Sequence, residues 1–229
     1  MSSWKIKKMS GHCGARLEGV SLSNASNSDL EEMRSALFEY GIIVMPDQNL
    51  NPEDHLKLAK FFGPIDVNRF FTPVATHPMI AEVRTSAEQS EVIGGTWHTD
   101  HSYDVAPAMC SILSARQLPP HGGDTHFASM SAAYKALSPG LKKMLSSLRA
   151  WHSDSSFSES NVGLENNPDA FRDPVLHPVI IRLEERAEPA YSLPGVTDSA
   201  LRPLQSGAYC HFRKPTQQWL YIIHINLLE

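Results

Sequence analysis

The chain carries the stretch Gly94-Gly95-Thr96-Trp97-His98-Thr99-Asp100-His101-Ser102-Tyr103-Asp104, which places an imidazole and a carboxylate two positions apart behind a double glycine. If this run forms a β-strand, side chains at positions i and i+2 point to the same face, so His98 and Asp100 would project together. An imidazole nitrogen and a carboxylate oxygen at that separation can bind one metal ion. A third ligand from elsewhere would complete the two-histidine, one-carboxylate face of a non-haem Fe(II) site.

The spacing alone does not establish a metal site. Histidine and aspartate are common enough in this chain for a match to arise by chance, and a second one occurs at His152-Ser153-Asp154. The sequence context of the two matches therefore has to distinguish them.

The composition predicts one soluble globular domain spanning residues 1–229, with 41% hydrophobic and 20% charged residues. A net charge of −5 without a basic run argues against nucleic-acid binding. No secretory signal and no apolar stretch of transmembrane length is visible, so we expect no membrane span and a cytoplasmic location. The three cysteines are far apart and odd in number, which predicts buried thiols rather than disulfides.

Two helices are predicted ahead of the opening stretch. Ser28-Asp29-Leu30-Glu31 indicates a capping box that opens a helix ending at Gly41, and a short buried strand follows at 42–45. Asn51 is expected to cap a second helix, with a proline in its first turn and an end at Gly63. We interpret both helices as scaffold.

The second half predicts short strands around a helical segment. Strand candidates lie at 80–83, 107–115 and 125–127, and two helices are expected between 129 and 148, the first capped by Ser129 or Ser131. This pattern favours a mixed α+β, β-rich fold, in which a jelly-roll barrel carries flanking helices. No Gly-x-Gly-x-x-Gly follows a strand, so a dinucleotide-binding fold has no support.

Several ordered motifs carry a family resemblance across residues 5–182. They are Gly14-Ala15, Tyr40-Gly41, Asp47-Gln48, Phe62-Gly63, Trp97-His98-Thr99-Asp100, Pro107-Ala108, Leu118-Pro119, Gly122-Gly123-Asp124-Thr125, Ala133-Tyr134-Lys135-Ala136-Leu137-Ser138, Leu148-Arg149-Ala150 and Leu176-His177-Pro178-Val179. Together they resemble the taurine dioxygenase family of Fe(II)- and 2-oxoglutarate-dependent dioxygenases. The resemblance implies a double-stranded β-helix, which is a jelly roll.

The resemblance also implies roles for individual residues. His98 and Asp100 would be iron ligands, and the hydroxyl of Thr125 would contact a carboxylate of the cosubstrate 2-oxoglutarate. With O2, the reaction would hydroxylate a small organic molecule and release succinate and CO2. Tyr103 and Asp104 are expected to brace the ligand stretch through hydrogen bonds. The second match, His152-Ser153-Asp154, is interpreted as structural, and family members are often homo-oligomers.

The substrate positions depart from the family pattern. Asn68 and Phe71 stand where taurine dioxygenases carry a sulfonate-binding histidine and then a tyrosine, and Gly94 stands in place of an asparagine. An amide can still donate a hydrogen bond, but the cationic partner of a sulfonate is lost. We therefore expect a small anionic or apolar substrate other than taurine.

The tail, residues 183–229, does not show the remaining family motifs, which are a distal iron histidine and a cosubstrate arginine. The tail contains two histidines, His211 and His224, and the second lies in an apolar run at 219–225 that predicts a strand. The third ligand is open between them. We hypothesise that the tail is truncated or out of frame, which leaves open that C-terminal strands of the fold are missing.

Two alternatives to an active dioxygenase follow. One is a catalytically impaired fold relic or binding protein that lacks the distal iron ligand. The other is a zinc hydrolase that uses His98, Asp100 and a tail histidine, but no general-base carboxylate at metal-site spacing supports it.

Overall fold

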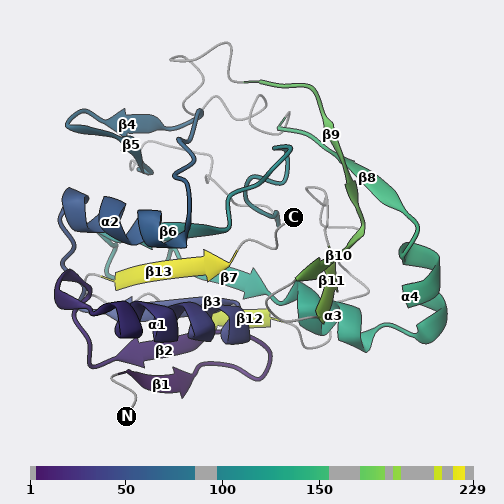
Figure 1. Cartoon of the computed structure of the whole chain (residues 1–229), viewed down its shortest axis with the longest axis horizontal. Coiled ribbons are helices and arrows are strands. Elements are labelled where there is room, and N and C mark those ends of the chain that lie inside the picture. The colour runs from purple at the N-terminus through teal and green to yellow at the C-terminus, as the bar shows by residue number, and fades with distance from the viewer. Residues whose placement is uncertain are drawn as a thin grey trace.

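The computed structural model describes residues 4–85, 97–154 and 171–183, and the backbone of three further strands at 188–191, 209–212 and 219–224. From residue 182 onward, only the backbone is described. Helices and short strands alternate along these ranges (Figure 1). The predicted mixture of helices and sheets is therefore confirmed.

The largest sheet has five strands in the order β1-β2-β3-β13-β6. Their bounds are Lys5–Lys8 for β1, Ala15–Glu18 for β2, Ile42–Pro46 for β3, Trp219–His224 for β13 and Cys110–Ser114 for β6. β13 pairs antiparallel with β3 on one side and with β6 on the other. The strand predicted at 219–225 is confirmed, and the tail supplies an interior strand of this sheet.

Helix α1 (Asn27–Tyr40) packs on this sheet, across β2 and β3 (Figure 1). Its apolar residues Leu30, Met33 and Leu37 are buried in one cluster with Leu17 of β2 and Ile43 of β3. The predicted spacing of apolar residues on this helix therefore identifies its buried face.

The sequence predicted the C-terminal end of α1 correctly and its N-cap wrongly. Gly41 ends the helix as expected, with a φ of 75° that favours glycine. The cap is Ser26 and not Ser28, because the side chain of Asp29 accepts a hydrogen bond from the Ser26 N–H while Ser26 Oγ accepts from Asp29 N–H. The acidic residue that closes a capping box lies three positions after the cap, which fits Ser26 with Asp29.

Helix α2 (Pro52–Phe62) begins as predicted, with Asn51 Oδ1 accepting a hydrogen bond from Asp54 N–H at 2.7 Å. The short 3-10 helix η1 (Leu22–Asn24) precedes α1. His55 of α2 donates from Nε2 to the carbonyl oxygen of Ile112 at 3.2 Å. This contact joins α2 to β6, the strand that follows the candidate metal ligands.

The other described elements form pairs of strands and two short helices. The pairs are β4 (Thr72–Val74) with β5 (His77–Glu82), β8 (Arg149–His152) with β9 (Val175–Pro178), β10 (Ile180–Leu183) with β11 (Glu188–Tyr191), and β12 (Tyr209–Phe212) with β7 (Thr125–Ala128). Ser129 caps α3 (Met130–Ala136), and Ser138 caps α4 (Pro139–Leu145). The second of these helices ends three residues earlier than expected, because β8 begins at Arg149.

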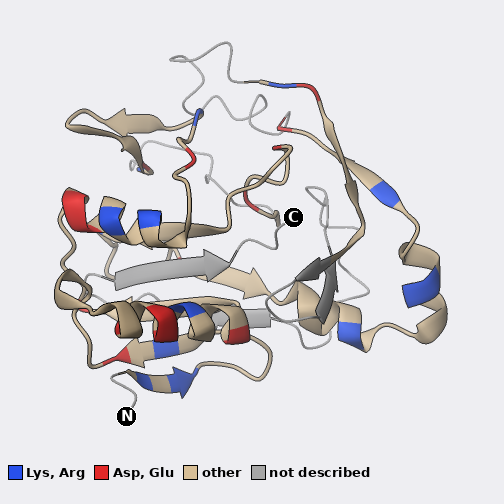
Figure 2. Cartoon of the chain, in the orientation of Figure 1, with Lys and Arg blue, Asp and Glu red and all other residues tan. Residues whose placement is uncertain are grey.

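The edge of the main sheet is basic. The three lysines of β1 are exposed, and Figure 2 shows them along the outermost strand. Lysine on an edge strand disfavours pairing with a second chain, because such pairing would bury the charge of the lysine. Lys7 also forms an ion pair with Glu18 at 2.9 Å.

The structure bears on two expectations from the sequence, one about membrane-spanning helices and one about the cysteines. None of the helices in the described ranges has the length and apolar content needed to span a membrane. Cys110 is a free thiol whose pKa is raised by burial to about 12, but Cys13 is disulfide-bonded. The prediction of thiols was wrong at Cys13, because spacing along the chain does not show which cysteines the fold brings together.

Substitution of the core residue Leu37 tests the packing of α1. Leu37 is 0% exposed, so Leu37→Ala is expected to lower the free energy of unfolding by about 2–5 kcal/mol through lost contacts and a cavity. Leu141 of α4 is 44% exposed, and Leu141→Ala is expected to change stability by only about 0.5 kcal/mol. Urea unfolding measures both, and equal losses would contradict the described core.

Candidate metal centre

The described part of the opening stretch is not a strand. Residues 97–99 have no regular structure, and a turn begins at Asp100, with Asp104 N–H donating to the carbonyl oxygen of His101 at 2.9 Å. The condition that the run forms a β-strand is therefore not met in residues 97–104, where His101 also takes a left-handed conformation with a φ of 55°. The side chains of His98 and Asp100 still converge, and His98 Nε2 lies 3.1 Å from Asp100 Oδ1.

The carboxylate of Asp100 is fixed from the main sheet. Ser111, on β6, donates from Oγ to Asp100 Oδ2 at 2.8 Å, which leaves Oδ1 facing His98. Burial raises the pKa of Asp100, but the hydrogen bond and charge of His98 and the hydrogen bond of Ser111 lower that pKa below its ordinary value. An ionised carboxylate is the form that binds a metal.

The distance between the two side chains fits adjacent ligands of one ion. Two ligand atoms about 2.1 Å from an ion and at right angles to each other are about 3 Å apart. The separation of His98 Nε2 and Asp100 Oδ1, 3.1 Å, agrees with this value. The side chains are 43% and 34% exposed, so an ion and further ligands can reach them.

One tail histidine lies beside the strand of the predicted cosubstrate residue. Thr125 is the first residue of β7 and is half-buried. In the antiparallel pairing of β7 with β12, Phe212 is opposite Thr125 and His211 is opposite His126. The backbone register thus places His211 next to the position that faces Thr125.

The other tail histidine lies beside the strand that carries Ser111. In the pairing of β13 with β6, His224 is opposite Cys110 and Ile223 is opposite Ser111. Both tail histidines therefore lie on strands paired with site-bearing strands, and the choice of third ligand stays a prediction at this point.

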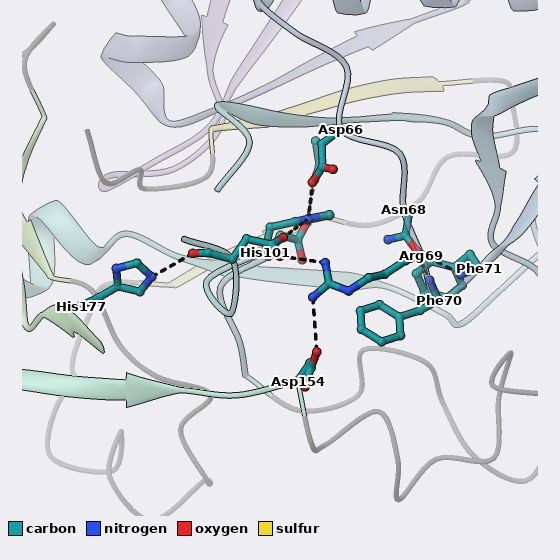
Figure 3. Close-up of polar contacts among 11 residues, drawn as sticks. Asp66, Asn68, Arg69, Phe70, Phe71, His101, Asp154 and His177 are labelled. Atoms are coloured by element: carbon teal, nitrogen blue, oxygen red, sulfur yellow. Dashed lines mark hydrogen bonds and ion pairs between the residues drawn. The ribbon is translucent and has the colours of Figure 1, made fainter. Parts of the chain in front are cut away.

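The predicted substrate positions are only partly described. Asn68 is half-buried, and its Oδ1 accepts hydrogen bonds from the N–H groups of Phe70 and Phe71 at 2.8 and 3.0 Å (Figure 3). This oxygen thus stabilises the turn after α2. Phe71 is half-buried beside it, and Gly94 lies outside the described residues.

A charged network that was not predicted surrounds the turn after Asp100. We call it the Arg69 network, and its members are Asp66, Arg69, His101, Asp104 and Asp154 (Figure 3). Arg69 contacts Asp104 Oδ1 at 2.7 Å and Asp154 Oδ2 at 3.3 Å. His101 Nδ1 lies 2.9 Å from Asp66 Oδ2 and 3.2 Å from Asp104 Oδ2. The bracing role expected for Asp104 therefore has a partner, Arg69, that the sequence did not indicate.

Three members of this network also have metal-binding side chains. One ligand atom each of Asp66, His101 and Asp104 lies within 4.8 Å of the others. Burial lowers the pKa of His101, but hydrogen bonds with Asp66 and Asp104 and the charges of Asp66 and Asp100 raise that pKa above its ordinary value. The Arg69 guanidinium faces Asp104 in this group, and a cation already paired with the carboxylate disfavours a metal ion at the same place.

The second His-x-Asp match has structural contacts. His152 and Asp154 are 1% and 3% exposed, and Asp154 Oδ2 accepts from Arg69 and from the N–H of Arg172. The ring of His152 lies 5.1 Å from that of His177, whose Nε2 donates to the carbonyl oxygen of Asp104 at 3.0 Å. This segment therefore supports the turn beside the candidate metal ligands.

Comparison with known families identifies the chain. The family model described as taurine catabolism dioxygenase TauD, TfdA family matches residues 5–217. The chain belongs to this family. The match continues past Arg182, where the motif resemblance ends, and it includes His211 of β12 but not His224 of β13. TauD-family dioxygenases use Fe(II), 2-oxoglutarate and O2, as the sequence predicted.

Two curated relatives show the chemistry found in similar chains. The chain is 30% identical over 164 residues to the (S)-phenoxypropionate/alpha-ketoglutarate-dioxygenase of Sphingobium herbicidovorans, covering 70% of this chain and 57% of the relative. It is 27% identical over 168 residues to the alpha-ketoglutarate-dependent sulfonate dioxygenase of Saccharomyces cerevisiae, covering 69% and 41%. The chain thus spans about half the length of the curated relatives it matches.

A solved structure shows the same fold. The crystal structure of AAD-2 in complex with Mn(II) and N-oxalylglycine matches with a TM-score of 0.74 and 22% identity, covering 98% of this chain and 88% of that chain. The likeness covers the tail, which agrees with the pairing of β12 and β13 in the two sheets.

Protonation of His152 is expected to destabilise the protein. Burial and the charge of His177 lower its pKa from 6.5 to about 4. Between these pH values the unfolded chain binds a proton that the folded chain does not, so stability is complete above about pH 6.5 and falls toward pH 4. The loss attributable to His152 is on the order of 3 kcal/mol.

Urea unfolding at pH 7 and pH 4.5 measures this loss. The drop between the two pH values is expected to be smaller in His152→Gln, which does not titrate. Leu37→Ala removes no titrating group and is expected to keep the full drop. An unchanged drop in His152→Gln would contradict the assignment.

Proposed function

We propose that the chain is an Fe(II)- and 2-oxoglutarate-dependent dioxygenase that hydroxylates a small organic anion, with release of succinate and CO2. The observation that carries the proposal is the convergence of His98 Nε2 and Asp100 Oδ1 at 3.1 Å, in a chain of the TauD family. The pair is accessible, and Ser111 fixes the carboxylate oxygen that does not face His98.

The protein residues would hold and orient the reacting groups. His98 and Asp100 would bind the metal on one side, leaving its other positions to a third ligand, to 2-oxoglutarate and to O2. When bound, the metal with 2-oxoglutarate and O2 supplies the oxidation of a substrate C–H bond. Thr125, at the start of β7, would contact a carboxylate of 2-oxoglutarate through its hydroxyl.

The arrangement of the strands supports one jelly-roll domain over residues 1–229. Antiparallel pairing of β12 with β7 and of β13 with β6 joins the tail to strands that follow the His-x-Asp stretch. Such pairing of late strands with earlier ones is expected of a double-stranded β-helix.

His211 is the favoured third ligand. It lies within the residues matched by the family model, whereas His224 lies beyond them. Its strand, β12, also pairs with β7, so His211 lies beside the register position that faces Thr125. A metal ligand and a cosubstrate contact are expected to be neighbours, because 2-oxoglutarate binds the metal directly.

A small anion is the favoured class of substrate. The named substrates of the two relatives are a phenoxypropionate and sulfonates, which are anionic. Asn68 and Phe71 lie in the turn after α2, where Asn68 Oδ1 is occupied by two backbone donors. Its amide N–H groups would therefore be the part of Asn68 that meets a substrate anion.

Anaerobic addition of Fe(II) and 2-oxoglutarate tests the proposed activity. The unsubstituted protein is expected to develop a weak visible charge-transfer band and, with O2, to release succinate. His98→Ala and Asp100→Ala are expected to lose both signals, while His121→Ala, at an exposed position, retains them. Absence of the band and of succinate in the unsubstituted protein would leave the impaired relic or binding protein as the better interpretation.

Separate substitution of the two tail histidines tests the third ligand. His211→Ala is expected to weaken Mn(II) binding by about tenfold or more, and His224→Ala to leave it within about twofold. Isothermal titration calorimetry measures both affinities. The reverse order would assign His224, and two unaffected variants would show that neither residue binds the metal.

A further inference from the structure

The turn that follows Asp100 is held by contacts from the segment after α2 and from β9. We propose that Arg69 is a positioning residue, which fixes the turn 101–104 and so holds Asp100 in the orientation that lets it share a metal ion with His98. This inference rests on the proposed function. It adds a residue that touches neither substrate nor metal but determines how tightly the metal is held.

The turn needs support because its backbone is unfavourable. His101 has a φ of 55°, a left-handed conformation that is unfavourable for a residue with a side chain. One backbone hydrogen bond, from Asp104 N–H to the His101 carbonyl oxygen, closes the turn. Such a conformation persists when surrounding contacts determine it.

Arg69 supplies those contacts with both ends of its guanidinium. Nη1 donates to Asp104 Oδ1 at 2.7 Å and Nη2 donates to Asp154 Oδ2 at 3.3 Å, so one planar group joins the turn to the segment that follows β8. The side chain is 15% exposed, and its guanidinium carbon lies 4.8 Å from the ring centroid of Tyr103, within the same turn. A lysine offers one point charge and cannot reproduce this fork.

Contacts from other residues also hold this turn. His101 contacts Asp66, which precedes Arg69 in the segment after α2, and His177 of β9 donates to the Asp104 carbonyl oxygen. Asp154 is itself held by the N–H of Arg172. The turn is thus contacted by the segment after α2 and by β9, and Arg69 links it further to Asp154, which follows β8 (Figure 3).

The position of the turn explains why a change in the turn is expected to change metal affinity. Asp100 directly precedes His101, so movement of the turn changes the direction in which the Asp100 carboxylate points. Ser111 fixes one oxygen of that carboxylate, and the turn fixes the backbone that carries it. Partners that orient metal ligands typically contribute 10- to 100-fold to metal affinity.

The test compares Arg69→Met and Arg69→Lys with matched variants of Arg16, in the full-length chain. Arg16 forms an ion pair with Glu18 on β2, away from this network, and is 36% exposed, so Arg16→Met and Arg16→Lys remove the same groups elsewhere. Mn(II) affinity in the presence of 2-oxoglutarate is measured by electron paramagnetic resonance of free Mn(II). The visible spectrum of the Co(II)-saturated protein is recorded in parallel.

Arg69→Met is expected to bind Mn(II) at least about tenfold more weakly than Arg16→Met and to show a changed Co(II) spectrum. Lost stability alone would leave the spectrum of the folded, saturated protein unchanged. If Arg69→Met does not fold, as judged by near-ultraviolet circular dichroism, Arg69→Lys and Arg16→Lys decide by the same two measurements.

Failure of the positioning role of Arg69 and failure of the proposed function give different results. Normal affinity and an unchanged spectrum in the folded Arg69 variant would overturn the positioning role while leaving the proposed dioxygenase in place. Failure of the unsubstituted protein to bind Mn(II) and Fe(II) with 2-oxoglutarate would overturn the proposed function, and with it the role of Arg69.

Discussion

A guanidinium that is partly removed from water needs partners, and the pairing of Arg69 organises the part of the molecule that carries the candidate chemistry. Removing a charge from water is unfavourable unless hydrogen-bonded partners of opposite charge compensate it. Asp104 and Asp154 supply those partners from segments 35 and 85 residues away along the chain. The segment after α2, the turn at 101–104 and the end of β8 must therefore adopt their places together, and the candidate metal ligands next to the turn depend on all three.

Local features of the fold could be predicted because their causes are local. Leu30, Met33 and Leu37 mark the buried face of α1 by their spacing, and Asn51 caps α2 through a hydrogen bond to a residue three positions on. His98 and Asp100 are two residues apart, so the sequence could indicate them as a candidate ligand pair, although the same spacing recurs at His152-Ser153-Asp154. Arg69 and Asp154 were not, because an ion pair across 85 residues leaves no periodic signal.

The tail shows a different limit of sequence-based prediction. Its family motifs cannot be recognised, yet β13 occupies an interior position between β3 and β6. Strand pairing uses backbone N–H and C=O groups, and an apolar run such as Trp219–His224 satisfies it without any particular motif. The identity of an iron ligand requires one histidine at one position, so the strand at 219–225 could be predicted where the chemistry of the tail could not.

The two His-x-Asp matches share a spacing but differ in what their oxygens are free to do. Both Asp154 and Asp100 accept a hydrogen bond on Oδ2, from Arg69 and Ser111 respectively. The side chains of His152 and Asp154 are 1% and 3% exposed, which keeps an ion from their ligand atoms, whereas those of His98 and Asp100 are 43% and 34% exposed and face each other through Nε2 and Oδ1. A metal site needs lone pairs that an ion can reach in the correct direction. Accessibility and orientation therefore distinguish a candidate ligand pair from a structural segment, and the structural segment, through Asp154 and Arg69, supports the turn beside the ligand pair.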